Sequence, residues 1–363
     1  MKIFWCKNCL NMSTRPRIEF DKKGICNACI WSAEKKKINW VKRKKFLKRY
    51  LDKDKNQFNC LVPVSGGKDG SYVAYSLREK FNARVLCATV RPSYELDVGK
   101  KNLFNFLKKD FDHVHITINH SLVRKLDKIG FEDFGQGYYG WMIAIHTAVL
   151  RIAKNFDINL VMYGEDGEVE YGGSTKYKYT PFYGTEYMKK IFLNNTYNHI
   201  LKKSRFKKNE QFWFSFPEKL SKNLKIAHYS YFDHWDSYKN YLTAKKFMDL
   251  EELESSNTGT FTNFAQNDQE LAALHYYLMY LKFGFGRATQ DAGIEIRRGS
   301  MNRDQAKNLV KLYDGHFPEI YLKNYLNYFS MSKNKFFQII DKHVNKKLFK
   351  KVKGIWKPNY KIL

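Results

Sequence analysis

The sequence lacks the features that place a protein in or across a membrane. Its best apolar run, residues 141–150, contains His146 and is far shorter than the roughly 20 residues that span a bilayer. The first residues, MKIFWCKNC, lack the long apolar region and the cleavage site of a secretory signal. These absences exclude a membrane protein and predict a cytoplasmic one.

Acidic residues are scarce relative to basic ones. The chain has 64 Lys and Arg against 36 Asp and Glu, a formal net charge of +28. Such an excess favours nucleic acid or another polyanion as partner. The lysines are nevertheless spread along the whole chain together with many Asn, Tyr, Phe and Ile, a bias that a coding background rich in A and T also produces. The charge alone leaves both explanations open.

Cysteine is also rare, and four of the six cysteines form a pattern. Two C-x2-C pairs, Cys6 with Cys9 and Cys26 with Cys29, are separated by 16 residues. This spacing is typical of a tetrahedral four-thiolate site, because each two-residue gap lets a tight turn direct both sulfurs at one ion. Four protein ligands leave no open position, so we expect structural zinc or, with the same ligands, an iron–sulfur cluster. Residues 1–35 are expected to form a zinc-ribbon-like knuckle, and residues 36–57 a basic linker helix.

The stretch CLVPVSGGKDGS, residues 60–71, joins a strand predicted at residues 58–64 to a helix predicted from Ser71 onward through a glycine-rich loop. Backbone N–H groups exposed by glycines, together with a helix N-terminus, form a cradle for phosphate. The spacing excludes the P-loop G-x-x-x-x-G-K-[ST] and the dinucleotide pattern G-x-G-x-x-G. A nucleotide site of a different type is therefore expected, with Lys68 and Asp69 as its catalytic residues.

Strands and helices alternate after this loop. The chain is expected to form strands at residues 83–90, 113–118 and 158–163 and helices at residues 97–111 and 140–156. This alternation predicts an α/β fold with a doubly wound parallel sheet, in which ligands bind at the carboxyl ends of the strands. Arg91 and Glu165 would share that edge with the loop. Glu165, Asp166 and Glu168 could hold Mg²⁺ or contact an electropositive group, and a solvated turn is an equally good explanation.

The loop SGGKDG, followed by Ser71, resembles the PP-loop, SGGxDS in its usual form, of the ATP pyrophosphatase superfamily, whose fold is of the adenine nucleotide alpha hydrolase type. The resemblance implies cleavage of ATP between the α and β phosphates, adenylation of a substrate oxygen and release of pyrophosphate. Gly70 stands where the superfamily usually has serine. The residues expected to contact ATP are Ser65, Gly66, Gly67, Lys68, Asp69, Gly70, Ser71 and Arg91.

Longer stretches of the sequence resemble one particular family within this superfamily. Residues 3–40, VMYGEDGEVEYGG, NTGTFTNFAQND and residues 275–319 together resemble the N-acetyl sugar amidotransferases of bacterial surface-polysaccharide and flagellar-glycan biosynthesis, the WbpG and PseA type. This implies a ligase that adenylates the acetamido oxygen of an acidic nucleotide sugar or nonulosonic acid, such as a pseudaminic or legionaminic acid. Ammonia then replaces that oxygen to form an acetamidino group.

The C-terminal block contains a polar helical stripe. Gly284 and Gly286 separate two predicted helices, and the second carries charged residues at four-residue spacing and two arginines at its end. Arginine suits bidentate contacts to carboxylate or phosphate, although an interhelical ion-pair network explains the stripe equally well. The expected substrate-binding residues are Glu165, Asp166, Arg287, Asp291, Arg297 and Arg298. We divide the rest of the chain into a PP-loop domain, residues 58–260, with a possible lid at 176–224, and a helical substrate or partner domain, residues 261–363.

The chain lacks a cysteine suited to glutamine hydrolysis. It begins Met-Lys, whereas an N-terminal-nucleophile glutaminase begins with cysteine, and neither Cys60 nor Cys87 lies on a Gly-x-Cys-x-Gly elbow. We therefore expect a separate glutaminase partner and, as the resemblance implies, a channel-forming cyclase-like subunit.

Two other classes of function remain. A tRNA-modifying thiolase or lysidine-type ligase shares the PP-loop, the paired cysteines and the basic charge, but a thiolase usually needs a catalytic cysteine or a third cysteine cluster, and no cysteine follows Cys87. An RNA-binding zinc-ribbon protein with a degenerate loop is the non-enzymatic alternative.

Overall fold

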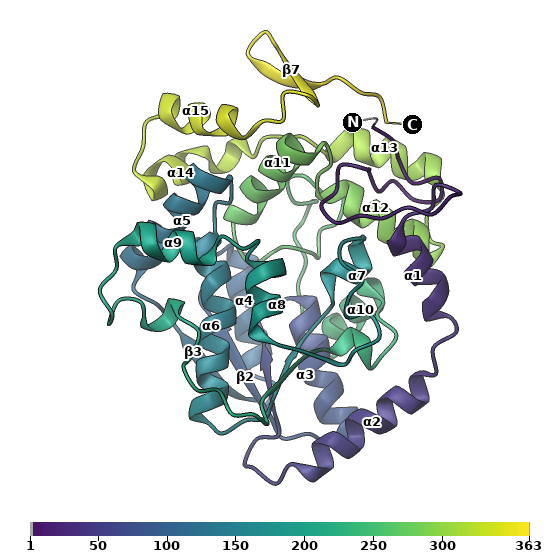
Figure 1. Ribbon diagram of the computed structural model, residues 1–363, viewed down its shortest axis with the longest axis vertical. Coiled ribbons are helices and arrows are strands. Elements are labelled where there is room, and N and C mark those ends of the chain that lie inside the picture. Colours follow the sequence, from purple (N-terminus) through teal and green to yellow (C-terminus); the bar gives the residue numbers. More distant parts are fainter. Residues whose placement is uncertain (1–2, 363) are drawn as a thin grey trace.

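The computed structural model describes residues 3–362, and a six-stranded sheet lies at its centre (Figure 1). The strand order is β3-β2-β1-β4-β6-β5, and only the pairing of β5 with β6 is antiparallel. The chain runs outward from β1 to β3 and then crosses to the other side of β1, which confirms the expected doubly wound α/β class. The strands are β1 (Cys60–Pro63), β2 (Val85–Val90), β3 (Asp112–Ile116), β4 (Leu160–Tyr163), β5 (Phe182–Tyr183) and β6 (Lys225–His228).

Side chains of each strand alternate between two cores. Leu61 faces one core, whereas its neighbours Cys60 and Val62 face the other. The first core is covered by α5 (His120–Phe134) and α6 (Tyr139–Asn155). The second is covered by α2 (Trp40–Lys53), α3 (Lys68–Phe81), α4 (Asp97–Leu107) and α10 (Ser237–Met248). Because helices bury both faces, the central strands are continuous apolar runs, which is the pattern that predicted them.

The predicted elements match the observed ones where the local pattern is strong. The helix expected at 140–156 is α6, and the strands expected at 83–90 and 158–163 contain β2 and β4. The edge strand β5, its neighbour β6 and the helix α5 were not predicted. β6 has only four residues and begins with a lysine, so its apolar run is too short to stand out.

The segment at residues 176–224 packs against α6. It contains α8 (Thr185–Tyr187), a π-helical turn (Met188–Phe192), α9 (Tyr197–Ser204) and a 3-10 turn (Phe212–Phe214). The hydroxyl of Thr147 in α6 donates to the carbonyl of Trp213 at 2.6 Å. The apolar side chains of the segment belong to the first core. The segment expected as a lid therefore covers one face of the sheet in this structure.

The N-terminal knuckle is less regular than the expected ribbon. Two antiparallel bridges, Trp5 with Met12 and Phe20 with Cys26, replace its strands, and α1 (Asn27–Lys35) begins directly after Cys26. The basic helix expected after the knuckle starts as a separate helix, α2, where the side chain of Asn39 accepts the N–H of Lys42 at 2.9 Å.

The C-terminal helices form a layer at the end of the molecule opposite α2 (Figure 1). They bury a third core with Phe131 of α5, and the chain then ends in a short hairpin. Asn302 and Gln305 form a capping box, which confirms the predicted N-cap. The elements are α11 (Leu271–Phe283), α12 (Arg287–Arg298), α13 (Arg303–Tyr313), α14 (Leu322–Phe329), α15 (Lys333–His343), β7 (Phe349–Val352) and β8 (Ile355–Pro358).

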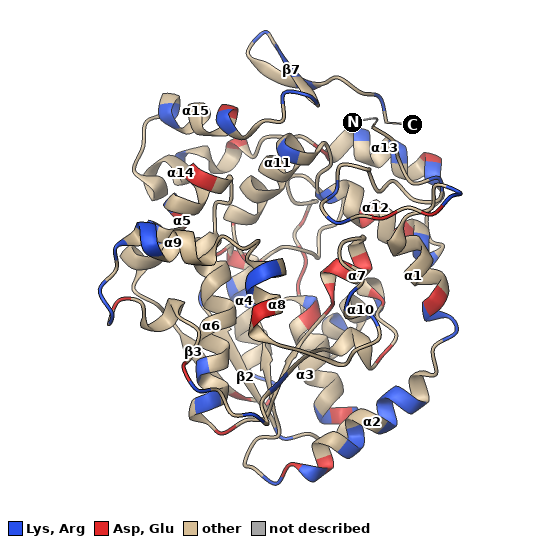
Figure 2. Cartoon of the chain, in the orientation of Figure 1, with Lys and Arg blue, Asp and Glu red and all other residues tan. Residues whose placement is uncertain are grey.

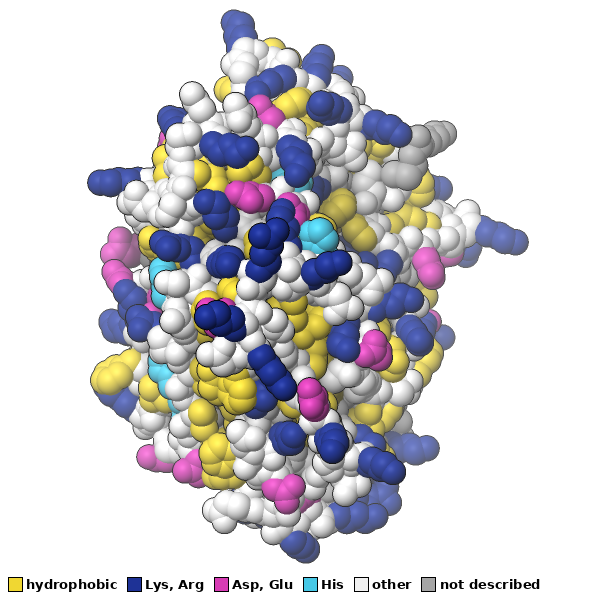
Figure 3. Space-filling model, turned by 60° about the vertical axis from the view of Figure 1, so that its left-hand side comes forward, with side chains coloured by type: hydrophobic (Ala, Val, Ile, Leu, Met, Phe, Trp, Pro, Cys, Tyr) yellow, Lys and Arg dark blue, Asp and Glu magenta, His cyan; other side chains and the backbone are white. Residues whose placement is uncertain are grey.

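Positive charge is distributed over many elements. Lysine and arginine side chains are scattered over the face shown in Figure 3, and α2 carries several of them along its length (Figure 2). In residues 3–362, no helix combines the length and the apolar character needed to cross a bilayer.

Candidate active site

The glycine-rich loop and the acidic loop meet at the point where the sheet reverses direction. β1 pairs with β2 on one side and with β4 on the other, so the segments after β1 and β4 leave the same edge next to each other. Ligands of doubly wound sheets bind in the crevice at this switch point. The structure thus brings Ser65 and Glu165 to one place, as the sequence predicted.

The glycine-rich loop is fixed by close backbone contacts. Gly66 has φ of +80°, and a Cβ at this position would lie 2.3 Å from the backbone nitrogen of Leu103 in α4. Gly67 is the N-cap of α3, which therefore begins at Lys68, three residues earlier than the expected start at Ser71. Lys68, Asp69 and Gly70 lie in the first turn, where backbone N–H groups have no helical partner and favour an anion.

Packing explains why glycine replaces the usual serine at position 70. A Cβ on Gly70 would lie 2.9 Å from the carbonyl oxygen of Pro63 and 3.1 Å from the Cα of Val64, and both neighbours are backbone atoms of the preceding strand and loop. The hydroxyl of Ser71 is buried without a hydrogen-bond partner and does not line a cavity at the loop. Neither position therefore offers a serine hydroxyl to a ligand there.

A cavity of about 110 Å³, the loop cavity, lies against the glycine-rich loop. Ser65 and residues 67–70 form one wall, and Gly99 and Asn102 of α4 form a second. The opposite wall consists of Leu250 and residues 264–268. Residues 264–268 belong to the NTGTFTNFAQND block, but sequence reasoning assigned none of them to the site. The one sequence signal that could have pointed to residues 264–268 was the resemblance of this block to the N-acetyl sugar amidotransferases.

Lys68 and Asp69 form an ion pair at the mouth of the loop cavity. Lys68 is only 7% exposed, and its Nζ donates to Oδ2 of Asp69. The amide of Asn240 lies 3.4 Å from the other carboxylate oxygen of Asp69. A buried lysine supplies positive charge in a region of low dielectric, where its effect on a phosphate is strongest.

Glu165 faces Asp69 across the switch point. Its carboxylate accepts hydrogen bonds from the hydroxyl of Tyr171 at 2.8 Å and from the indole N–H of Trp235 at 3.1 Å. Burial and, to a lesser degree, the negative charge of Asp69 raise the pKa of Glu165 above its usual value. The carboxylate of Asp69 is therefore close enough to disfavour the ionised form of Glu165.

The other residues of the acidic loop are occupied by structural contacts. Asp166 caps α7 (Gly167–Tyr171), because its side chain accepts the N–H of Glu168 at 3.1 Å. Burial raises the pKa of Asp166 to about 7. Glu168 forms a bidentate ion pair with Arg17, both contacts being 2.7 Å. These partners leave Glu165 as the residue of the expected acidic trio that faces the site.

A second cavity of about 260 Å³, the arginine cavity, is lined in part by Glu165. It is lined by residues from α1, the loop before α10, and the end of α12, including Arg297 and Arg298. Nη2 of Arg297 donates to the carbonyl of Glu170 at 3.0 Å, and Nε of Arg298 lies 3.4 Å from the carboxylate of Asp236. Glu165, Arg297 and Arg298 thus line one cavity, and their role in binding substrate stays a prediction.

The remaining predicted residues lie elsewhere. Arg287 and Asp291 form a buried ion pair at 2.8 Å, and neither lines the loop cavity or the arginine cavity. Both residues lie in α12, so the pair is an i,i+4 contact within one helix and not the interhelical network that the sequence left open as the alternative to substrate binding. Arg91 follows β2, but its side chain pairs with Glu95 at 2.7 Å outside the loop cavity.

The four knuckle cysteines converge on one point. Their sulfur atoms all lie within 4.8 Å of one another, with 3.8 Å between Cys6 and Cys29 and 3.6 Å between Cys9 and Cys26. A tetrahedral zinc ion with bonds of about 2.3 Å separates its sulfurs by about 3.8 Å, so the geometry fits a single ion. N–H groups of Asn8 and Asn11 donate to these sulfurs at 3.3 to 3.4 Å, which stabilises thiolates. The expected metal site with four cysteine ligands is therefore present.

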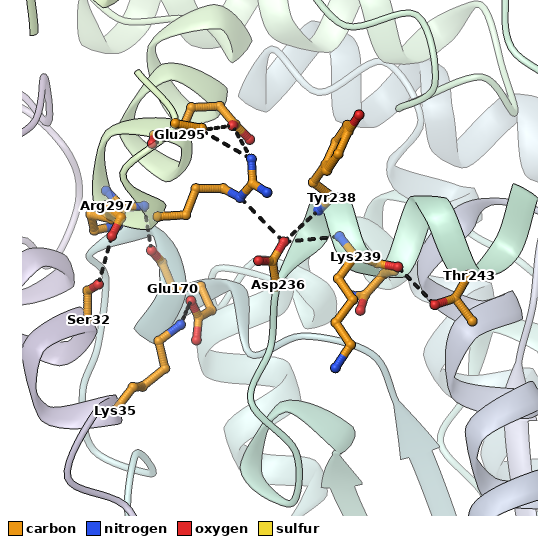
Figure 4. Close-up of polar contacts among 12 residues, drawn as sticks. Ser32, Lys35, Glu170, Asp236, Tyr238, Lys239, Thr243, Glu295 and Arg297 are labelled. Atoms are coloured by element: carbon orange, nitrogen blue, oxygen red, sulfur yellow. Dashed lines mark hydrogen bonds and ion pairs between the residues drawn. The ribbon is translucent and has the colours of Figure 1, made fainter. Parts of the chain in front are cut away.

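Glu170 connects the knuckle to the arginine cavity. Its carboxylate accepts a hydrogen bond from the indole of Trp31 in α1 at 2.9 Å. It also accepts one from Lys35 of the same helix at 2.7 Å (Figure 4). Arg297 contacts its carbonyl from the other side. Burial by itself would lower the pKa of Arg297, but the thiols of the knuckle and the carboxylate of Glu170 raise it. The metal site thus holds two walls of the arginine cavity together.

Comparisons with known proteins identify part of the chain. Residues 258–362 match the family described as LPS biosynthesis protein WbpG-like, C-terminal domain. The uncharacterized protein MJ1599 of Methanocaldococcus jannaschii is 31% identical over 107 residues, which are 28% of this chain and 38% of that protein.

A solved structure, the U34-tRNA thiolase NcsA from Methanococcus maripaludis with its [4Fe-4S] cluster, aligns with 86% of this chain and 89% of its own at 15% identity and a TM-score of 0.34. The fold assignment rests on the strand order and not on this alignment. The family expected from the C-terminal sequence block is confirmed by the match at residues 258–362. The matched residues include Arg297 and Arg298 at one cavity and residues 264–268 at the other, so this part of both sites is similar to the WbpG-like C-terminal domain.

Proposed function

We propose that the protein is an ATP-dependent amidotransferase that converts the acetamido group of an acidic sugar into an acetamidino group. The observation that carries this proposal is the position of the two cavities on either side of Asp69 and Glu165. The loop cavity suits the phosphates of ATP, and the arginine cavity suits an anionic acceptor. The WbpG-like C-terminal part supports an acceptor from lipopolysaccharide biosynthesis.

The chemistry has two balanced steps. The acetamido oxygen attacks the α-phosphorus of ATP, the bond to the β-phosphate oxygen breaks, and pyrophosphate leaves as the amide nitrogen loses its proton. Ammonia then adds to the imidoyl carbon of the adenylate, and AMP departs with the original amide oxygen. The product is an amidine, so the acceptor exchanges a neutral amide for a cationic group.

The chain's own residues position charge for these steps. Lys68 and the free N–H groups of the first turn of α3 would stabilise the phosphate oxygens. Arg298, with Arg297 behind it, would bind the carboxylate or phosphate of the acceptor. Glu165 would accept a proton or orient the attacking group, because burial raises its pKa above the usual value of a carboxyl group. Mg²⁺, when bound with ATP, supplies further charge neutralisation at the phosphates.

Ammonia is proposed to come from a separate glutaminase, with a cyclase-like subunit as its channel. Cys60 and Cys87 are fully buried in β1 and β2, where glutamine cannot reach them. Zinc is the proposed occupant of the knuckle, because the sulfur spacing fits one tetrahedral ion. ATP and nucleotide sugars are cytoplasmic metabolites, so the reaction is proposed to occur there.

Release of pyrophosphate from ATP tests the proposal. Purified protein with ammonium chloride should release pyrophosphate when supplied with an acetamido-containing acidic nucleotide sugar or nonulosonic acid, and mass spectrometry should show a product about 1 Da lighter than the acceptor because NH replaces O. Turnover with glutamine as sole nitrogen source should be absent. Turnover only with tRNA would instead establish the tRNA-modifying alternative.

Two variants test the proposed roles of the loop cavity and the arginine cavity. Lys68→Met should lower kcat/KM by about 10²-fold or more, the usual consequence of removing one charge-stabilising group. Arg298→Met should raise KM for the acidic acceptor while leaving KM for ATP unchanged. Lys311→Met, on the exposed side of α13, is the matched control and should behave as the native protein.

A further inference from the structure

The loop cavity is lined by two acidic residues from distant parts of the chain; Asp69 is paired with Lys68, whereas Asp268 lacks a cationic partner among the described residues. Asp69 contributes a carboxylate from α3, and Asp268 contributes a carboxylate from the segment before α11. Among residues 3–362, Asp268 forms no ion pair with a lysine, arginine or histidine. Burial raises the pKa of Asp268 to about 6, although N–H groups of its own residue and of Gln269 partly offset this.

Asn267 provides the independent indication of a ligand. It lines the same cavity and is only 8% exposed, yet its side-chain carbonyl Oδ1 is buried without a hydrogen-bond partner. Its Nδ2 donates to the carbonyl of Asn263 at 2.7 Å, so the amide is already oriented. A buried acceptor without a partner costs free energy unless a ligand satisfies it.

The segment that carries these oxygens is held firmly. The N–H of Leu96 donates to the carbonyl of Asp268 at 3.2 Å, and Glu95 forms a β-bridge with Gln269. Gly99 allows this approach, because a Cβ there would lie 2.5 Å from the carbonyl oxygen of Asn267. The oxygen atoms of Asn267 and Asp268 are therefore preorganised at the wall of the cavity.

We propose that Asp69, Asn267 and Asp268 form a binding site for a divalent cation that enters with the phosphates of ATP. Carboxylate and amide oxygens are preferred ligands of Mg²⁺, which is usually bound by one or two carboxylates together with substrate phosphates. Without the cation, both carboxylates would repel the phosphates beside Lys68. The WbpG-like C-terminal part thereby completes the nucleotide site and does more than bind the acceptor.

The acidic loop is a poorer place for this cation. The carboxylate of Glu165 is hydrogen-bonded by Tyr171 and Trp235, that of Asp166 caps α7, and that of Glu168 is paired with Arg17. All three of these acids already have partners that a metal would have to displace, whereas on the other side Asp69 is paired with Lys68 but Asp268 has no cationic partner among the described residues. The expectation that the acidic loop holds Mg²⁺ is therefore replaced by a site on the opposite wall of the loop cavity.

Binding of Mn²⁺, followed by electron paramagnetic resonance, tests the site in the full chain. The titration is made with Mn²⁺ alone and again with α,β-methylene-ATP, which cannot release pyrophosphate. Asp268→Asn should weaken the binding of Mn²⁺ to the chain–nucleotide complex by about tenfold or more, because loss of even an indirect metal partner commonly costs that much. Asp97→Asn, which removes an exposed acid of α4, is the matched control and should bind Mn²⁺ as the native chain does.

A second measurement separates binding from folding. Asp268→Asn should unfold at the same or a higher temperature than the native chain without cation, because a buried carboxyl group with no cationic partner is removed. Native-like Mn²⁺ binding by Asp268→Asn, or loss of Mn²⁺ binding by Glu165→Gln instead, would overturn the proposal.

The inference rests on the proposed use of ATP, but its failure is distinguishable from failure of the proposed function. Mn²⁺ and α,β-methylene-ATP bind without any acceptor. Intact Mn²⁺–nucleotide binding with no turnover of acidic sugars would refute the acceptor assignment alone. Turnover that persists in Asp268→Asn with unchanged dependence on Mg²⁺ would refute the cation site alone.

Discussion

Replacing Gly70 by alanine tests whether close packing of α3 against β1 fixes the glycine-rich loop. The new Cβ would lie 2.9 Å from the carbonyl oxygen of Pro63 and 3.1 Å from the Cα of Val64. Both are backbone atoms, so no side-chain rotation relieves the contact. In an open helix, alanine gains about 1 kcal/mol over glycine, whereas overpacking costs about 1–3 kcal/mol. We expect a net loss of up to about 2 kcal/mol of unfolding free energy.

Thermal unfolding with and without ATP measures this loss. An unfolding entropy of about 2.1 cal/mol/K per residue makes 1 kcal/mol equivalent to about 1.3 °C for this chain, so Tm should fall by up to about 3 °C. ATP should stabilise the variant less than the native protein, because the displaced first turn of α3 carries Lys68 and the free N–H groups.

Two further variants make the result specific. Gly70→Ser should behave like the alanine variant, because the Cβ and not the hydroxyl causes the contact. Gly167→Ala is the matched control, since its Cβ would meet Tyr171 at an ordinary 3.5 Å, and its Tm should be unchanged or higher. A serine variant with native Tm and native ATP affinity would refute the steric explanation for Gly70.

Two other predictions concern the knuckle and the buried histidines. Cys26→Ser should remove the metal and release Trp31 from Glu170, so that tryptophan fluorescence shifts to the red. The affinity for the acceptor should then fall, while the affinity for ATP stays unchanged. An unchanged fluorescence spectrum with full loss of metal would contradict the link between the knuckle and the arginine cavity. Burial lowers the pKa of His146 to about 4, so its contribution to stability is present above about pH 6.5 and is lost as the pH falls toward 4. From urea unfolding, His146→Leu should therefore lose about 2–3 kcal/mol less than the native chain between pH 6.5 and 4, whereas His316→Leu, which changes an exposed histidine, should follow the native profile.

Patterns that depend on neighbouring residues were predictable. The strand, loop and helix around the glycine-rich loop, the cysteine pairs and the cap at Asn302 all follow from chain segments of a dozen residues or fewer. The start of α3 was placed three residues late because Lys68, Asp69 and Gly70 show no apolar periodicity. Their helical conformation follows from the N-cap at Gly67 and from the packing of Gly70 on the preceding strand.

The functions of individual charged residues could not be predicted from local sequence patterns. Glu168 and Arg287 were equally plausible as ligands, and the structure gives each an internal partner, Arg17 and Asp291. Tertiary packing brought Arg17 to Glu168 from 151 residues away, whereas Asp291 lies one turn from Arg287 on the same helix, and only the burial of that pair away from both cavities depended on the fold.

The sequence by itself determined the chemistry available to this protein: a phosphate-binding loop at a strand–helix junction, four thiolates at metal-site spacing, and arginines at the end of a C-terminal helix. Only the tertiary structure decided which of these groups share a site. It placed Asn267 and Asp268 against a loop two hundred residues earlier and joined the cysteine knuckle to the arginine cavity through Glu170. Contacts of that sequence separation arise when separate cores pack together, and no local pattern along the chain encodes them.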